Sequence, residues 1–126
     1  MNNLQILDCT LRDGGYINNW SFGNKVTRQI LKYLSEAHID IVECGFLSDV
    51  EYDPDRTIFN DVLQIKAILP VNKVKYVVMI ALGEKEIDYE KVPKCDPNVI
   101  WGIRLTFHKH EIERAFDYAQ NLMSKG

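Results

Sequence analysis

The sequence lacks a long hydrophobic run, a basic cluster and a signal peptide. No apolar stretch approaches the roughly 20 residues that a membrane-spanning helix needs, and the N-terminus has neither the basic start nor the apolar stretch of a secretory signal. We therefore expect a cytoplasmic protein without a membrane partner. The formal net charge is -3, and because no run of lysine and arginine is present, the sequence argues against nucleic acid as the main partner.

Cysteine is scarce and shows no pairing pattern. The cysteines Cys9, Cys44 and Cys95 are widely separated and contain no CxxC pair, which excludes the usual signatures of a disulfide framework and of a thiolate zinc site. We expect all of them to be reduced, with two in strands and facing the core. With 126 residues, 46% of them hydrophobic and 26% charged, the chain is typical of one soluble globular unit.

Apolar periodicity predicts four units in which a strand is followed by a helix or by weakly helical sequence. The expected strands cover residues 4–7, 39–46, 76–82 and 100–107, and the expected helices cover 24–37, 60–69 and 111–124, with weakly helical or irregular sequence over 85–96. The third strand is almost uninterrupted apolar sequence, which is typical of a parallel strand covered on both faces. Because strands and helices alternate without hairpins, the sequence predicts an α/β fold with a parallel sheet and right-handed crossovers.

Two of the helices are expected to bury an apolar stripe. Asn24 is the expected cap of the first helix, and Pro70 is expected to stop the second. The residues expected on the buried faces are Val26, Ile30, Tyr33, Leu34 and Ala37 in the first helix, and Ile112, Ala115, Phe116, Ala119, Leu122 and Met123 in the last.

The most informative segment is 7–15, which reads LDCTLRDGG. If the first strand extends through it, Asp8, Thr10 and Arg12 point the same way, because strand side chains alternate between faces. Asp13 then lies at the rim, where two glycines let the chain turn sharply. A strand with such a polar carboxyl end is unusual unless something binds there.

Polar side chains also mark the ends of later strands. Glu43 lies on the second strand, and Arg104, Thr106 and His108 share one face of the fourth. Two architectures fit the strand and helix order: a doubly wound open sheet, or the N-terminal half of a TIM (β/α)8 barrel, for which about 250 residues is usual. Length favours the open sheet. The polar strand ends favour the barrel, because they would converge on one site, and we predict that 1–126 forms its N-terminal half.

The segments LDCTLRDGG and VECGF resemble the DRE-TIM metallolyases, a superfamily of metal-dependent aldolase and acyltransferase barrels. The group includes hydroxymethylglutaryl-CoA lyase, isopropylmalate synthase and 4-hydroxy-2-oxovalerate aldolase, and the chain is most similar to aldolases of the last type. The resemblance implies that Asp13 is a ligand of a divalent metal, Mn or Mg, and that Arg12 faces a developing enolate. It makes Glu43 the third signature residue and Asp8 a supporting residue at the substrate site.

The chemistry that this resemblance implies is reasonable on physical grounds. Cleavage of a carbon-carbon bond beside a carbonyl leaves an enolate, and a hard cation with oxygen ligands can hold a 2-oxo acid while it spreads that charge. Arg12 would add a fixed positive charge there, and Glu43 would orient its guanidinium. We therefore expect an aldolase-type lyase with a 2-oxo acid and an aldehyde as its small-molecule partners. The alternatives are Claisen condensation of an acyl-CoA with a 2-oxo acid, and a non-catalytic binding or assembly module.

The sequence departs from the family pattern at Tyr16, where the aldolases have histidine and many acyltransferases glutamine. Tyr16 is a candidate proton donor, although a phenol is a poor base at neutral pH, or it packs under residues 17–20. The family's H-x-H metal pair lies on a later strand, so we expect His108 at the mouth of the site and His110 towards the next helix. Arg104 either binds a substrate carboxylate or pairs with a neighbouring acid.

Four strands of a barrel leave two open sheet edges and an uncovered lumen face. We therefore expect the chain to be the front part of a longer protein, with the remaining metal ligands beyond residue 126. Alone it would be inactive, or it would associate with further copies to cover its edges. Such association predicts a dimer or larger species in light scattering.

Overall fold

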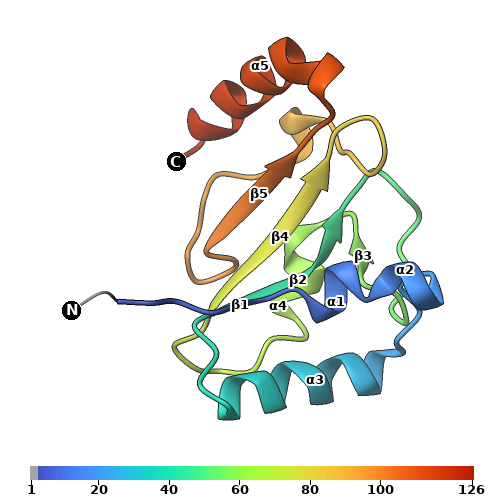
Figure 1. The fold of residues 1–126 in the computed structure, drawn as a ribbon, viewed down its shortest axis with the longest axis vertical. Helices are drawn as coiled ribbons and strands as arrows, with labels where there is room; N and C mark the ends of the chain where they lie inside the picture. Colours follow the sequence, from blue (N-terminus) through green and yellow to red (C-terminus); the bar gives the residue numbers. More distant parts are fainter. Residues whose placement is uncertain (1–2) are drawn as a thin grey trace.

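The structure is a computed structural model that describes residues 3–126, and in this range the strands form one parallel sheet (Figure 1). The strands are β1 (Leu7–Asp8), β2 (Ile41–Leu47), β3 (Ile58–Phe59), β4 (Lys75–Ala81) and β5 (Gly102–Thr106). Their order is β1-β2-β4-β5, with β3 paired to β2, and each of these pairings is parallel. The predicted α/β fold with a parallel sheet is confirmed, whereas the two-residue strand β3 was not predicted.

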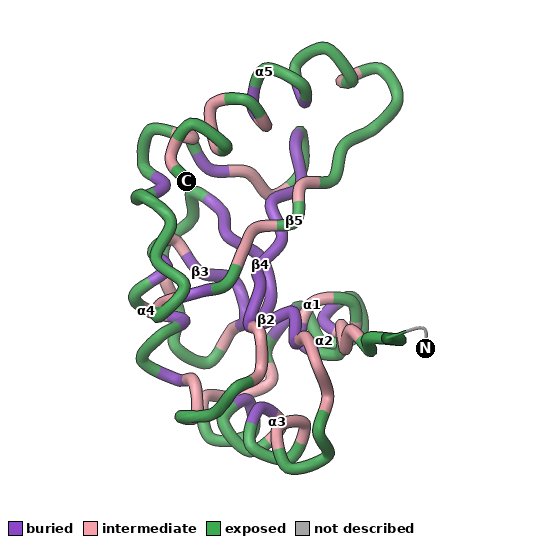
Figure 2. The backbone as a smooth tube through the Cα atoms, turned by 90° about the vertical axis from the view of Figure 1, so that its left-hand side faces the viewer, coloured by how far each residue is buried: buried purple, intermediate pink, exposed green. Residues whose placement is uncertain are grey.

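Helices separate the strands along the chain. They are α1 (Thr10–Asp13), α2 (Gly15–Asn18), α3 (Asn24–Glu36), α4 (Val62–Lys66) and α5 (Ile112–Met123), with the 3-10 turns η1 (Tyr89–Lys91) and η2 (Lys109–Glu111). α3 and α5 lie at opposite ends of the molecule, and α1 and α2 lie together near β2 (Figure 1). Buried residues are concentrated in β2 and β4, at the centre of the sheet (Figure 2). Within residues 3–126 no helix is long and apolar enough to cross a membrane.

The two faces of the sheet have different surroundings. The main core includes Val42 and Cys44 of β2 and Val78 and Ile80 of β4, together with buried side chains of α3, α4 and α5. A smaller apolar cluster contains Trp20, Phe46, Ile58, Met79 and Ala81. Because neighbouring strand residues point to opposite faces, Glu43 faces away from the main core.

The motif segment differs from the prediction, because the chain turns into a helix sooner than expected. β1 ends at Asp8 and α1 begins at Thr10, so Asp8, Thr10 and Arg12 do not share a strand face. The predicted sharp glycine turn is also wrong, since Gly14 has a right-handed helical φ of -63°. Small size is what the glycines contribute: a Cβ on Gly15 would lie 1.9 Å from Cδ1 of Trp20.

The long helices bury narrower faces than the sequence predicts. In α3 the buried residues are Thr27 and Leu31, flanked by half-buried Ile30 and Leu34, whereas Val26 and Tyr33 are exposed. This set occupies positions i, i+3, i+4 and i+7, so the helix turns one stripe towards the core. Asn24 is the first helical residue, after Gly23, rather than the predicted cap.

α5 shows the same narrowing of its buried face. Ala115 and Tyr118 are buried, while the predicted core residues Ile112, Phe116 and Met123 are exposed. The helix rests on the segment after β4, where the Tyr118 hydroxyl donates a hydrogen bond to the Ile87 carbonyl at 2.5 Å.

The remaining local predictions are partly confirmed. α4 ends at Lys66, before Pro70, and begins at a capping box formed by Asp61 and Gln64. The segment predicted as weakly helical or irregular contains only the short turn η1. The three cysteines are free, as predicted, but Cys44 alone lies in a strand, while Cys9 follows β1 and Cys95 is exposed.

Candidate functional site

A buried glutamate joins three elements of the fold. Glu43 on β2 is 0% exposed, and its two carboxylate oxygens accept from two arginines. Arg12 Nε, on α1, donates to Glu43 Oε1 at 2.6 Å, and Arg104 Nη1, on β5, donates to Glu43 Oε2 at 2.8 Å. We refer to these residues as the Arg12-Glu43-Arg104 network. Both oxygens of the buried carboxylate are thereby satisfied, as a buried charge requires.

The network shows one of the two contacts that the sequence left open for Arg104. Arg104 was expected either to bind a substrate carboxylate or to pair with a neighbouring acid, and the structure places it against Glu43. Burial disfavours the charged form of Arg12, but the hydrogen bond and the negative charge of Glu43 outweigh this effect and raise the pKa of the guanidinium. Arg12 is therefore held as a cation in a fixed orientation.

Asp13 and Asp8 lie at the two ends of α1. The side chain of Asp13 is 69% exposed, and its Oδ1 accepts from Arg12 Nη1 at 3.1 Å. Asp8 accepts from both the backbone N–H and the hydroxyl of Thr10, at 2.9 and 3.0 Å. Asp8 thus stabilises the change from β1 to α1 through a local turn, which places Arg12 opposite Glu43.

A pocket of about 320 Å³ opens where β2, β4 and β5 end. Of the predicted site residues, the structure brings Arg12, Tyr16, Thr106 and His108 together in its wall. Asp8, Asp13, Glu43 and Arg104 do not line it. The other lining residues are Phe46, Met79, Ala81, Leu82, Glu84 and Phe107. The carboxyl ends of parallel strands are where α/β enzymes place their active sites.

Histidine and carboxylate side chains meet at one wall of this pocket. His108 Nε2 lies 2.7 Å from Glu84 Oε1, and the rings of His108 and His110 stack with their centroids 5.8 Å apart. His110 lies in η2, immediately before α5, as the sequence predicted. The position of His108 at the pocket is also as expected, while its partner Glu84 was not foreseen because it belongs to the preceding strand-helix unit.

Aromatic side chains also contribute to the pocket lining, namely Tyr16, Phe46 and Phe107. Trp20 is buried, its indole Nε1 donates to the Arg12 carbonyl at 2.7 Å, and its ring contacts the rings of Tyr16 and Phe46 at centroid distances of 4.8 and 5.6 Å. Tyr16 both lines the pocket and packs on Trp20, so the two interpretations of this residue are compatible. The Nζ of Lys85 lies 4.1 Å from the centre of the Trp20 ring, a contact for which the sequence contains no periodic signal.

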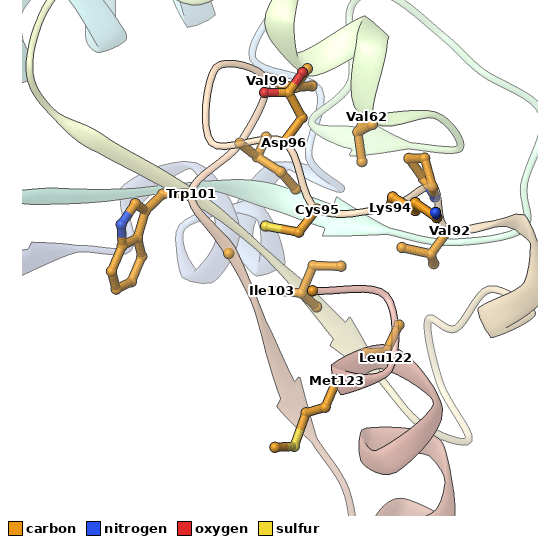
Figure 3. Close-up of a pocket in the computed structure, with 14 residues that line it drawn as sticks. Val62, Val92, Lys94, Cys95, Asp96, Val99, Trp101, Ile103, Leu122 and Met123 are labelled. Atoms are coloured by element: carbon orange, nitrogen blue, oxygen red, sulfur yellow. The ribbon is translucent and has the colours of Figure 1, made fainter.

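A second pocket, of about 200 Å³, lies beside the start of β5 and the end of α5 (Figure 3). Its lining is mainly apolar, with Lys94 and Asp96 as its charged side chains, and it also contains Cys95. None of the predicted site residues lies there. The polar pocket at the carboxyl ends of the strands is therefore the candidate functional site.

Comparison with known proteins identified one structural relative of this arrangement. The fold is similar to the crystal structure of the N-terminal domain of a putative aldolase from Bacteroides vulgatus, with a TM-score of 0.63 and 26% sequence identity. The match covers 98% of this chain and 42% of that chain. No family model and no curated protein matches the sequence.

The structural match bears on both the fold and the activity. It supports an aldolase-like α/β fold that is consistent with half of a barrel. This chain spans 42% of the length of the chain that it matches, so the activity of the whole protein is treated below as a proposal.

Proposed function

We propose that the protein is a divalent-metal-dependent aldolase-type lyase, which cleaves or forms a carbon-carbon bond next to a 2-oxo acid. The observation that carries the proposal is the Arg12-Glu43-Arg104 network, in which a fully buried carboxylate holds a guanidinium at the wall of a polar pocket. An ion pair with a purely structural role needs no adjacent pocket, whereas Arg12 of this network lines one. The resemblance of LDCTLRDGG and VECGF to the DRE-TIM metallolyases and the aldolase-like fold support the same assignment.

Arg12 is the group that would stabilise the reaction's negative charge. Breaking the bond beside the carbonyl of a 2-oxo acid leaves an enolate on the pyruvate half, and a fixed cation at that oxygen lowers the barrier because its orientation costs nothing during the reaction. Glu43 is a positioning residue, since both of its oxygens are occupied by arginines and neither is free to accept a substrate proton.

Asp13 would hold the metal. Its carboxylate is exposed next to Arg12 and offers the oxygen donors that Mg and Mn prefer. A divalent metal held at Asp13 would supply Lewis-acid stabilisation of the developing enolate. In residues 3–126 no three histidine, cysteine, aspartate or glutamate side chains lie close enough together to form a metal site, so Asp13 would be one ligand among others contributed from elsewhere.

Tyr16 and His108 are the candidates for proton transfer and for contact with the aldehyde. Both line the pocket with Arg12, and a phenol donates a proton to an alkoxide or carbonyl oxygen more readily than it accepts one. Thr106 adds a hydroxyl to the same wall. Tyr16 would thus act as the donor to the carbonyl of the aldehyde half, and His108, held by Glu84, would help to orient that half.

Metal binding tests this proposal directly. We expect the full-length protein to bind Mn, as measured by the loss of free Mn signal in electron paramagnetic resonance, and Asp13→Asn in that protein to weaken the binding at least about tenfold. Asp49→Asn is the matched control, because Asp49 is an exposed carboxylate paired with Lys91 outside the pocket. Unchanged Mn affinity in Asp13→Asn would refute the assigned ligand, and no Mn binding by the full-length protein would favour a non-catalytic module.

Product analysis separates the aldolase from the acyl-CoA alternative. Release of pyruvate from a panel of 4-hydroxy-2-oxo acids in the presence of Mn is the result expected for the proposed lyase. Release of free thiol from acetyl-CoA in the presence of a 2-oxo acid would instead identify a Claisen condensing transferase.

A further inference from the structure

Lys85 lies among three aromatic rings beside the candidate site. Its Nζ is 4.1 Å from the centre of the Trp20 ring, 5.1 Å from Phe46 and 5.7 Å from Tyr16. Tyr16 and Phe46 line the polar pocket with Arg12. Lys85 is not itself a lining residue, but its ammonium group contacts the rings of these two lining residues. We call Lys85 and its three rings the Lys85 cage.

The charge of Lys85 has no acidic partner in residues 3–126, where neither an ion pair nor a hydrogen bond of its Nζ is found. Other cationic or titratable groups near the pocket differ in this respect. Arg12 and Arg104 share the carboxylate of Glu43, and His108 contacts Glu84. Aromatic faces attract an ammonium group without neutralising it and without using its three N–H donors. The Lys85 cage therefore presents a charge and donors that the protein itself leaves unused.

The backbone of Lys85 is fixed in place. Ala81 and Lys85 exchange two backbone hydrogen bonds, each 2.8 Å long, across a tight turn in which Gly83 adopts a φ of +79°. Ala81 ends β4 and also lines the pocket. Because the turn and the rings together hold the side chain, a ligand pays little ordering entropy to bind there.

We propose that Lys85 is an anion-binding residue of the candidate site, and that it receives a carboxylate or phosphate group on the half of the substrate that is not the 2-oxo acid. This inference rests on the proposed function for its assignment of the 2-oxo acid to Arg12 and Asp13. The Lys85 cage is separate from the Arg12-Glu43-Arg104 network, so Arg12 in the pocket lining and Lys85 beside the pocket are two distinct positive points. A substrate with an anionic group at each end matches them better than a substrate with one.

Ligand binding measured by calorimetry in the presence of Mn tests the inference. The probes are pyruvate, with one anionic group, 2-oxoglutarate, with a second carboxylate, and 3-phosphonopyruvate, with a phosphonate in place of a phosphate. We expect the wild-type protein to bind at least one of the two doubly anionic probes about tenfold more tightly than pyruvate. The free energy of one charge-assisted hydrogen bond corresponds to a change in affinity of about this size. The tighter of these two identifies the chemistry of the anionic group.

The variants distinguish ligand binding from a structural role. Lys85→Met keeps the apolar stem, and we expect it to abolish the preference for the doubly anionic probes while pyruvate affinity stays within about twofold. Lys85→Arg is expected to retain the preference. Lys75→Met is the matched control, because Lys75 also lies over an aromatic ring, that of Trp101, at 4.5 Å but outside the pocket.

Three results would overturn the inference. They are the absence of a preference in the wild type, a preference that survives in Lys85→Met, and an equal loss of affinity for all three probes with a lowered thermal midpoint. The last result would mean that Lys85 only ties the α2 segment to the turn after β4. Pyruvate binding that persists while Lys85→Met has no effect refutes the inference and leaves the proposed function standing. Lys85-dependent binding of the doubly anionic probes without any binding of pyruvate supports the role of Lys85 and counts against the proposed function.

Discussion

At the scale of single residues, Glu43 is the side chain on which the candidate site depends. It is fully buried, yet both of its oxygens are occupied by arginines from other elements. A buried carboxylate of this kind is stable only while its partners remain. The arginines in turn need the carboxylate, because Arg12 is itself largely buried. The orientation of both arginines and the charge balance of the site therefore depend on Glu43.

Replacement of Glu43 by glutamine should destabilise the protein. The change removes the charge that balances Arg12 and Arg104, and we expect the free energy of unfolding to fall by about 3 kcal/mol. Urea unfolding followed by circular dichroism measures the loss. Asp49→Asn, in an exposed pair with Lys91, should cost less than about 1 kcal/mol, and a similar small cost in Glu43→Gln would contradict the role of the network.

At the residue scale, the position of several candidate side chains could be predicted where the sequence places them next to a strand end, whereas their roles remain predictions. Arg12, Tyr16, Thr106 and His108 line the same pocket because parallel strands bring their carboxyl ends to one edge of the sheet. Lys85 could not be predicted in this way. Its contacts depend on a turn after β4 that is folded back by two backbone hydrogen bonds, and on rings from other segments. The spacing of apolar residues along the sequence does not predict contacts between such separate segments.

At the scale of secondary structure, the segment that begins with LDCTLRDGG forms two short helices that are closely packed. α1 and α2 follow each other directly after β1, and the ring of Trp20 lies against Gly15. The sequence indicated a glycine turn because consecutive glycines commonly permit positive φ angles. Here Gly15 instead allows the Trp20 ring to pack against the backbone. This role depends on a tertiary contact and not on the local backbone preference of glycine.

Substitution of Gly15 by alanine tests this packing. The added Cβ would overlap the Trp20 ring at 1.9 Å, and we expect a loss of about 1 to 3 kcal/mol in unfolding free energy through overpacking. The displaced indole should also lose its hydrogen bond to the Arg12 carbonyl. Gly102→Ala is the control, because no atom lies within 4 Å of its added Cβ, and its effect should stay within about 0.5 kcal/mol. Equal stability of both variants would argue against the packing role.

The order of elements was predictable, whereas the buried helix faces were not. Strand-helix alternation and the apolar runs of β2 and β4 identify a parallel sheet because such strands are covered on both faces. The exposed side chains of Val26 and Phe116 show the limit of helical periodicity. A helix that contacts the sheet along one narrow stripe leaves apolar residues at the flanks in solvent, and the width of that contact is a tertiary property.

At the scale of the whole molecule, the sheet in residues 3–126 has two open sides. β1 and β5 each pair with one neighbour only, and the smaller apolar cluster around Phe46 and Met79 covers the face opposite the main core. The residues of this cluster are buried, so the open strand edges are what favours association with further strands. The similarity to part of a longer aldolase chain is consistent with the same view.

Light scattering over a range of protein concentrations tests the prediction of association. We expect the mass to rise above that of one 14.6 kDa chain towards a dimer or larger species, because pairing at β1 or β5 satisfies backbone groups that otherwise face water. A mass that stays at one chain at every concentration would count against this account of the open edges.

The most direct test of the central claim, that Arg12 stabilises an enolate at this site, is deuterium exchange into the methyl group of pyruvate. Exchange measured by proton NMR in deuterated water requires the enolate but no aldehyde partner. We expect the full-length protein to catalyse exchange that depends on Mn, and Arg12→Met to reduce the rate about 100-fold, with folding checked by circular dichroism. The absence of exchange with the wild-type protein, or an undiminished rate in a folded Arg12→Met variant, would contradict it.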